Sequence, residues 1–388
     1  MATLSTKPQA HANSRFLRAD KNLHRSFRRN TTLTKAIDNS GFWKRLFPKM
    51  AIIELRKRPT SKDVAQLAGV SFKTVSRVVN REPGVQAETR EAVLRAMEEL
   101  GYSPNIAARR LASRRSFLIV LLVWGGHSDY SAGLQAGAQR RCRELGYHLI
   151  IETVGLGEES RTVEQLCALG VDGVLVTAPL PRDGKLVNCL RAADLRHVLI
   201  SPAGLHQDSP SVEMDDERAG MEVTCHLIGL GHREIGFLGM TAIPASACRQ
   251  AGYLAALAAA DLVPRPEHDL ESKRGFKSIM ESAERLLDAA PRPTAIFAWN
   301  DVSALAVMMV AARRGLQIPG QLSVAGFDDS PPASFVWPSL TTIRQPLQKM
   351  AEAGIDILVS GDRTETPHLS LPFELIERES TAAPATVD

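Results

Sequence analysis

The sequence predicts an α/β protein in which a small domain of three short helices precedes a larger body made of two doubly wound, parallel-sheet lobes. Two patterns support this prediction. Residues 58–104 carry short helical stripes separated by capping residues and glycines. From residue 116 onwards, near-continuous apolar segments of strand length alternate with helical patterns, as is typical of buried parallel strands. The alternation runs through two successive series, and each series predicts one lobe whose strand ends face a cleft.

The charge of the chain is divided unevenly between its two ends. Residues 1–115 contain 24 Lys and Arg against 9 Asp and Glu, a net charge of +15. Because the whole chain of 388 residues carries +4, residues 116–388 carry −11. This asymmetry predicts a polyanionic partner for the head alone. Residues 1–57 show little periodicity, so we expect a basic, disordered extension, and Met50 is an alternative start.

Several classes of protein are disfavoured by what the sequence lacks. The five cysteines stand at least 22 residues apart, so they predict neither a metal site nor a redox pair and suit a reducing compartment. The first 30 residues lack the apolar core of a signal peptide, and the longest apolar run, FLIVLLVW from Phe117, has eight residues. No nucleophile–base–acid set and no Gly-rich phosphate loop is recognisable. We therefore expect a cytoplasmic protein without catalysis, cofactor, metal or membrane partner.

Three short helices are expected in the small domain. Thr60 with Asp63 resembles a capping box, Gly69 permits a tight corner, and Ser71 can cap the second helix. The third helix is expected over residues 88–100 and ends at a glycine. The expected core positions are Val64, Leu67, Ala68, Val75, Val78, Val79, Val93, Leu94, Met97 and Leu100.

The second of these helices presents a polar face opposite its valines. Lys73, Thr74, Ser76 and Arg77 lie on that face. A helix fits the major groove of DNA, where Arg and Lys can donate to guanine. A charged helix face is usually just a solvated surface, but the corner, the third helix and the basic head together favour a DNA-reading helix.

The combination of SKDVAQLAGVS, TVSRVVN and GYSPNIAARRLA resembles the LacI/GalR family of bacterial regulators. The resemblance continues through nearly all of residues 116–378 and leaves residues 1–57 outside. It implies a helix-turn-helix domain over 58–104, a hinge helix and linker over 105–115, a periplasmic-binding-protein-like effector and dimerisation domain over 116–380, and a tail over 381–388. The family's function is then expected: a homodimeric transcription regulator, most often a repressor, that binds palindromic operator DNA under the control of a small molecule such as a sugar.

The resemblance also assigns roles to residues of the head. Phe72, Lys73 and Arg77 take the positions that reach bases, although Phe72 offers only apolar contact and can equally be a core residue. Leu111 takes the place of the hinge leucine that enters the minor groove, and the alternative is a plain linker. The remaining residues expected at the DNA are Ser61, Ser71, Thr74, Ser76, Asn80 and Asn105.

In the body, the resemblance points to Arg249, Asn300 and Asp328, which we place where strands give way to loops or helices. A guanidinium facing a carboxylate suits a polyhydroxylated ligand, because each can make paired hydrogen bonds with neighbouring hydroxyls. Trp124 and Trp299 stand at equivalent strand ends and offer either an apolar floor for a sugar ring or ordinary core packing. The weaker candidates are Tyr130 and Ser201.

Two rival functions share parts of this pattern. A solute-binding protein of transport would have the same two-lobed body, but it would need a signal peptide and would not carry a DNA-reading head. A sugar-modifying enzyme would need a catalytic base or nucleophile that the sequence does not reveal.

Overall fold

The computed structural model describes residues 59–79, 84–102, 115–125, 128–155, 157–180, 182, 184–206, 208–360 and 366–385. They fall into two compact units, one within residues 1–105 and one within residues 106–388. The expected extension over 1–57 lies outside the described residues, as do Met50, Asn80, Asn105, Leu111 and most of the expected hinge. In the described part of the chain, no helix has the length and apolar character needed to cross a membrane.

The first unit contains the three predicted helices, α4 (Ser61–Leu67), α5 (Phe72–Val79) and α6 (Ala87–Leu100). The capping box is present, because Thr60 N–H donates to Asp63 Oδ2 at 2.7 Å and Asp63 N–H donates to Thr60 Oγ1 at 3.4 Å. Gly69 turns the corner at φ +63°. Ser71 Oγ then accepts a hydrogen bond from the N–H of Thr74 at 3.1 Å, which caps α5 as expected.

The core of this unit differs from the expected one at two positions. Leu67 and Leu94 are 46% and 51% exposed, so the prediction that they face inward is wrong. In α4 the buried side chains are Val64 and Ala65, and in α6 they are Val93 and Ala96. On a helix, the residues one and three positions after a buried residue lie on different sides of it, so the core covers only one of the two. The buried cluster consists of Val64, Ala65, Val75, Val78, Val93 and Ala96.

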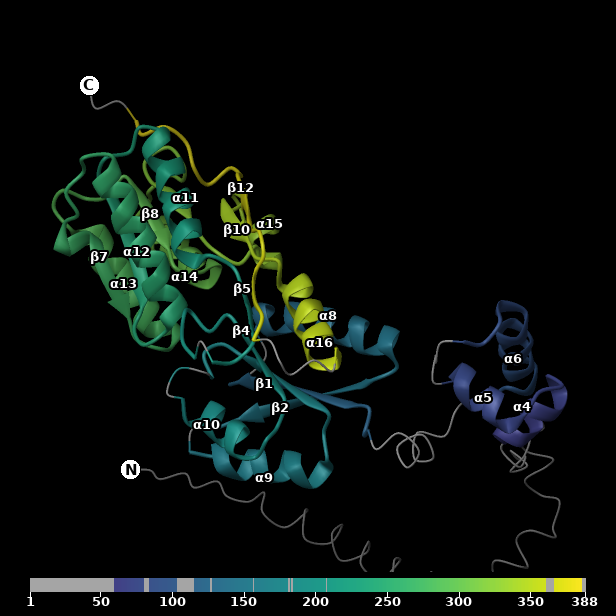
Figure 1. Ribbon diagram of the computed structural model, residues 1–388. Coiled ribbons are helices and arrows are strands. Elements are labelled where there is room, and N and C mark those ends of the chain that lie inside the picture. The colour runs from purple at the N-terminus through teal and green to yellow at the C-terminus, as the bar shows by residue number, and fades with distance from the viewer. Residues whose placement is uncertain are drawn as a thin grey trace, which may run out of the picture. The chain divides into compact units, whose positions relative to one another are not determined.

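The first lobe of the second unit is built on a six-stranded parallel sheet of order β11-β5-β4-β3-β1-β2 (Figure 1). Its strands are β1 (Leu118–Trp124), β2 (His148–Val154), β3 (Gly173–Thr177), β4 (His197–Ile200), β5 (Ser211–Glu213) and β11 (His368–Ser370). Its helices are α8 (Asp129–Leu145), α9 (Glu159–Leu169), α10 (Lys185–Ala192) and α16 (Leu347–Val359).

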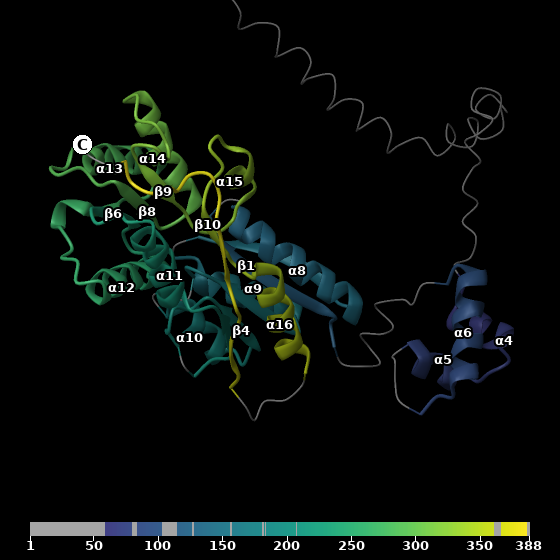
Figure 2. The same ribbon diagram turned by 90° about the horizontal axis from the view of Figure 1, so that it is seen from above.

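Both faces of this sheet are covered, which explains the apolar run of β1. Ile119 and Leu121 pack against α8 and α16, while Val120 and Leu122 pack against α9 and α10. The helices α8 and α16 lie side by side in both ribbon views (Figure 1, Figure 2). Gly137 makes this closeness possible, since a Cβ added there would stand 2.2 Å from the carbonyl oxygen of Gln348.

The second lobe contains a four-stranded parallel sheet of order β7-β6-β8-β9. Its strands are β6 (Ile235–Met240), β7 (Asp269–Ser272), β8 (Ala295–Ala298) and β9 (Ser323–Ala325). Its helices are α11 (Asp216–Gly229), α12 (Pro244–Ala259), the 3₁₀ turn η1 (Pro266–His268), α13 (Phe276–Asp288), α14 (Asp301–Arg313) and α15 (Pro331–Phe335). One face carries α11 and α12, the other α13 and α14.

The chain passes between the lobes three times: after β5, after β10 (Thr342–Arg344) and before β12 (Glu374–Ile376). β10 and β12 pair with each other in the antiparallel sense. The predicted fold class, a three-helix unit with a two-lobed parallel-sheet body, is thus confirmed. What the sequence pattern did not reveal is the return of α16 and β11 to the first lobe.

Candidate functional site

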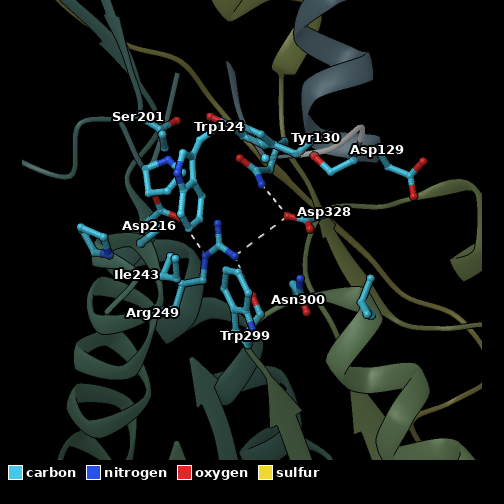
Figure 3. A pocket seen from close by; sticks show the side chains of 18 of the residues that line it. Trp124, Asp129, Tyr130, Ser201, Asp216, Ile243, Arg249, Trp299, Asn300 and Asp328 are labelled. Atoms are coloured by element: carbon cyan, nitrogen blue, oxygen red, sulfur yellow. Dashed lines mark hydrogen bonds and ion pairs between the residues drawn. The ribbon is translucent and has the colours of Figure 1, made fainter. Parts of the chain in front are cut away.

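A cavity of about 340 Å³ lies between the two lobes. Its lining includes Trp124, Tyr130 and Ser201 from the first lobe (Figure 3). From the second lobe come Arg249, Trp299, Asn300 and Asp328. The structure therefore brings together all seven side chains expected at the effector site. For the residues that follow strands, this convergence reflects the topology, because the carboxyl ends of parallel strands meet at one edge of each sheet.

Arg249 is fixed in the floor of the cavity by three contacts. Its Nε donates to Asp216 Oδ1 at 2.8 Å, and its Nη1 donates to the carbonyl oxygen of Trp299 at 2.6 Å. Its guanidinium carbon lies 3.4 Å from the ring centre of Phe327. The expectation that Arg249 stands at a strand end is wrong, since it lies within α12. Its direction is instead set by the packing of two helices.

That packing brings α12 against α11 at two glycines. A Cβ at Gly252 would stand 1.9 Å from the carbonyl oxygen of Glu217, and one at Gly220 would stand 2.3 Å from that of Arg249. Only glycine permits the helices to approach this closely. The approach places Asp216, at the first turn of α11, beside the guanidinium of Arg249.

Asp328 faces Arg249 from the end of β9. Its Oδ1 is 4.0 Å from Arg249 Nη1 and accepts a hydrogen bond from Gln345 Nε2 at 2.6 Å. Burial raises the pKa of Asp328 to about 7, in spite of the nearby guanidinium. The reason is that Arg249 is ion-paired more closely with Asp216 and neutralises Asp328 only in part. The backbone of Asp328 is also strained, at φ +117°.

The nearby carboxylate of Asp301 is occupied by hydrogen bonds from other residues of the protein. Asp301 accepts hydrogen bonds from Thr342 Oγ1 at 2.6 Å and from the N–H of Ser330 at 2.7 Å, and burial raises its pKa to about 6. Asn300 is partly committed as well, because its Oδ1 caps α14 by accepting the N–H of Ser303 at 2.9 Å. The side-chain amide nitrogen of Asn300 remains the atom with which it can serve a ligand.

Two indoles flank these charged groups. Trp124 is the last residue of β1, and Trp299 directly follows β8, as the sequence pattern predicted. The guanidinium of Arg274 stacks on Trp124, with its carbon 3.4 Å from the ring centre. Figure 3 shows the Trp124 and Trp299 rings on either side of Arg249.

Three buried polar atoms of the cavity residues have no partner in good hydrogen-bond geometry within the described chain: the hydroxyls of Tyr130 and Ser201, which lie near each other, and the indole nitrogen of Trp299. Such atoms are costly unless something pairs with them. Burial also raises the pKa of Tyr130, so its hydroxyl keeps its proton. Ser201 has a left-handed backbone, φ +52°, which is uncommon for a residue with a side chain.

Several lining residues were not anticipated from the sequence. Asp216 is the first residue of α11, directly after the chain has passed to the second lobe, and Gln345 lies on the segment that returns to the first lobe. No pattern of apolar residues marks these positions. Polar residues just after a strand were a usable signal for Asp216, which follows β5 by three positions. The other charged residues of the lining that were not anticipated are Asp129, Arg182, Arg274 and Asp301.

In the first unit, α5 presents the residues expected at DNA. Phe72 is 56% exposed, so the structure places its side chain outside the core, and Lys73 is also exposed. Arg77 is half-buried and makes contacts within the unit, and its Nη2 would lie 3.1 Å from a Cβ at Gly84. The other described candidates lie at the starts of α4 and α5 or along α5: Ser61 and Ser76 are half-buried, Ser71 is exposed, and Thr74 Oγ1 lies 2.9 Å from Ser71 Oγ.

The described residues contain no group of three or more His, Cys, Asp or Glu side chains arranged to hold a metal ion. The five cysteines are all free. His232 is buried in the second lobe. Its Nδ1 lies 2.9 Å from Thr294 Oγ1, and its Nε2 lies 2.9 Å from the carbonyl oxygen of Ala382. This imidazole ties the C-terminal segment to the second lobe.

Comparison with known protein families gives two matches. Residues 60–105 match the bacterial regulatory proteins of the lacI family, and residues 224–381 match a periplasmic binding protein-like domain. The chain is 36% identical over 344 residues to the HTH-type transcriptional regulator CelR of Thermobifida fusca, covering 84% of this chain and 100% of the relative. It is 33% identical over 346 residues to the HTH-type transcriptional repressor PurR of Erwinia tasmaniensis, covering 83% and 97%.

Solved structures agree with these relatives. A CelR–cellobiose complex matches with a TM-score of 0.64 at 33% identity, covering 83% of this chain and all of the other. The Lac repressor dimer bound to operator and the anti-inducer ONPF matches with a TM-score of 0.67 at 29% identity, covering 84% and 100%. The helix-turn-helix unit, the two-lobed body and these relatives lead to one conclusion: the chain belongs to the LacI family of bacterial transcriptional regulators.

Proposed function

We propose that this regulator is a homodimeric repressor of palindromic operators, controlled by a carbohydrate that binds between the lobes of the body. One observation supports the ligand class above all. Arg249, held by Asp216, lies 4.0 Å from Asp328 in the wall of a cavity that is flanked by Trp124 and Trp299. The guanidinium can donate to neighbouring hydroxyls and the carboxylate can accept from them, while the indoles offer flat apolar walls.

The unpaired atoms of the cavity favour the same class. An indole N–H can only donate, whereas the hydroxyls of Tyr130 and Ser201 can donate or accept. A ligand rich in hydroxyls supplies both kinds of partner at every position. The volume of about 340 Å³ lies at the lower end of the usual range for small-molecule sites, roughly 300–1,000 Å³. The complex of the relative CelR with cellobiose supports a carbohydrate of this size.

On the DNA side, the proposal assigns base contacts to Phe72, Lys73 and Arg77 of α5. The exposure of Phe72 supports this assignment, because an apolar side chain that lies outside the core can contact a thymine methyl. Phosphate contacts are assigned to Ser61, Ser71, Thr74, Ser76 and Asn80. The hinge contacts of Asn105 and Leu111 in the minor groove, and the limits 58–104, 105–115 and 116–380 of the three regions, belong to the same proposal.

The second copy is proposed to bind through the second lobe. Exposed apolar side chains lie on α14, at Met309, and around α15, at Phe335 and Trp337. Phe335 and Trp337 are 74% and 83% exposed, which is unusual for side chains of this size. The Lac repressor was solved as a dimer, which supports a dimer here. The proposal includes no catalysis, and it places the protein in the cytoplasm with its DNA.

The test uses the full chain, an operator chosen by selection from random palindromic DNA, and a panel of ligands. We expect cellobiose or a related glucoside to raise the melting temperature and to change operator affinity, whereas purine bases do neither. Asp328→Asn should abolish the ligand response and keep ligand-free operator binding, because residue 328 lies in the body. Arg285→Ala, a change at an exposed position on α13, is the matched control.

Binding of a purine base in place of every carbohydrate would refute the ligand class. A selection that yields no preferred DNA would refute the operator assignment. If Asp328→Asn retained full ligand affinity in calorimetry, the cavity would not be the effector site.

A further inference from the structure

Two contacts join the lobes beside the cavity, and neither involves the Arg249–Asp328 pair. Arg274, which follows β7 of the second lobe, places its guanidinium carbon 3.4 Å from the ring centre of Trp124 in the first lobe. Arg182, which follows β3 of the first lobe, donates from Nη1 to the carbonyl oxygen of Ala242 in the second lobe at 3.0 Å. Both arginines line the cavity.

Within the described chain, Arg274 lacks both the acidic partner that Arg249 has and the carbonyl partner that Arg182 has. Arg249 is paired with Asp216, and Arg182 donates to a carbonyl, but no carboxylate of the described chain forms an ion pair with Arg274. Partial burial lowers the pKa of Arg274, although the group stays charged at neutral pH. Its described contact is the π-face of Trp124, and a flat guanidinium at van der Waals distance covers that face.

Trp124 lies where the backbone leaves its strand. It is the last residue of β1 and is half-buried, and Gly125 follows it with φ +71°, where the backbone leaves the strand. A Cβ at Gly125 would stand 3.9 Å from Nη1 of Arg274, so the guanidinium also lies over the turn. The indole is thus held from one side by its own strand and from another by a residue of the opposite lobe.

We propose that Arg274 is a positioning residue, which holds the indole of Trp124 from the opposite lobe and completes the aromatic wall of the cavity only when the lobes are together. The hydrogen bond from Arg182 to the carbonyl oxygen of Ala242 is a second contact between the two lobes beside the cavity. This inference rests on the proposed function, because it explains how the fit of a ligand against Trp124 is linked to the arrangement of the lobes. A ligand that needs this wall then favours the arrangement in which Arg274 reaches Trp124.

The inference is tested first without ligand, on the full chain, with Arg274→Ala, Arg274→Lys and the control Arg285→Ala. Losing a cation–π contact of ordinary strength should speed amide exchange roughly two- to fivefold in peptides covering 122–125 and 241–245. Arg274→Lys should give a smaller change, since an ammonium cannot stack as a flat group. Arg285→Ala should give none.

Acrylamide quenching of tryptophan emission supplies the second measurement. Arg274→Ala should increase quenching, because the covered face of Trp124 opens to solvent, and the increase should vanish in a Trp124→Phe background. In a Trp124→Ala background, which leaves no ring for the guanidinium to cover, Arg274→Ala should no longer speed amide exchange.

Unchanged exchange and unchanged quenching would overturn the inference. So would a loss of cellobiose affinity without either change, since Arg274 would then act by touching the ligand directly. If the wild-type protein binds no carbohydrate, the proposed function fails, while the exchange and quenching measurements still decide whether Arg274 positions Trp124.

Discussion

At the scale of single residues, one guanidinium in the cavity stands between two carboxylates and serves them unequally. Arg249 Nε is 2.8 Å from Asp216, whereas Arg249 Nη1 is 4.0 Å from Asp328. Attraction between opposite charges falls with distance, so the guanidinium interacts more strongly with the carboxylate of Asp216 than with that of Asp328. Burial therefore raises the pKa of Asp328 to about 7, and a third carboxylate, Asp301, has a pKa of about 6.

This imbalance predicts a pH-dependent ligand affinity. A carboxylate that accepts hydrogen bonds from ligand hydroxyls must be ionised, so binding should weaken as the pH falls through 7. For a pKa of about 7, the affinity for cellobiose should be roughly tenfold lower at pH 6 than at pH 8, as measured by calorimetry. In Asp328→Asn, the residual ligand affinity should be nearly independent of pH. If the tenfold pH dependence remained in this variant, the titrating group would be Asp301 instead.

The same shift has a consequence for stability. The folded pKa of Asp328 exceeds the unfolded value of about 4, so the folded state binds the proton more tightly. The stabilisation from this group is therefore fully present below pH 4 and is lost as the pH rises through 7.

Arg77 offers the corresponding prediction on the DNA side. Arg77→Ala should weaken binding to the selected operator by about 1–3 kcal/mol and should weaken binding to random DNA less. Arg95→Ala, which removes an exposed charge from α6, is the control. Gel-shift titrations on both DNAs give the two losses, and equal losses in Arg77→Ala would mean that the guanidinium only contacts phosphate.

At the scale of elements, the glycine contact between α11 and α12 should determine both stability and ligand binding. Gly252→Ala forces a Cβ to within 1.9 Å of the carbonyl oxygen of Glu217 and should destabilise the body by about 1–3 kcal/mol. It should also weaken ligand binding, because Asp216 and Arg249 lie on the two helices that must move apart. Urea unfolding and calorimetry measure the two effects.

Gly229 provides the matched control within α11. A Cβ there would meet nothing within 4 Å, so Gly229→Ala should leave ligand affinity unchanged and raise stability by up to about 1 kcal/mol. If both variants behaved alike, the close approach of the helices would not be what orients Arg249.

The sequence predicted elements well where their signal is local. Apolar runs located β1, β3, β6 and β8, which are buried on both faces, and the capping box and Gly101 marked the ends of α4 and α6. It did not predict β11, whose three residues are all exposed and whose partner β5 lies more than 150 positions earlier. Pairing of this kind depends on the tertiary fold and leaves no periodic trace.

The same distinction applies to the cavity. Trp124 and Trp299 stand at strand ends and Asp328 follows β9 by three residues, so the order of the strands predicts that these side chains lie close together. Arg249 and Asp216 meet only because two helices pack at glycines, and Gln345 lies on a segment between the lobes. The roles of these three residues in the cavity cannot be predicted without the three-dimensional structure, and only the family resemblance pointed to Arg249.

At the scale of the whole molecule, the exposed aromatic side chains around α15 predict a dimer face. Trp337→Asp should weaken dimerisation by about 2 kcal/mol or more, as is usual for a buried aromatic at an interface. Val263→Asp is the control, because Val263 is 86% exposed but follows α12, which packs on the opposite face of the sheet from α14. Sedimentation over a range of concentrations measures the effect, and equal behaviour of the two variants would contradict the assignment.

The return of α16 to the first lobe also bears on how the protein is made. About 130 residues separate the end of β5 from α16, which is roughly 7–27 s of synthesis at about 5–20 residues per second. During that interval the sheet face later covered by Met350, Ala351 and Ile355 is bare on the nascent chain. The second lobe can close first, since its sheet and helices are contiguous in sequence. The first lobe can be completed only after α16 has been synthesised. A chain released before residue 347 would therefore expose an apolar sheet face, which favours chaperone binding or aggregation.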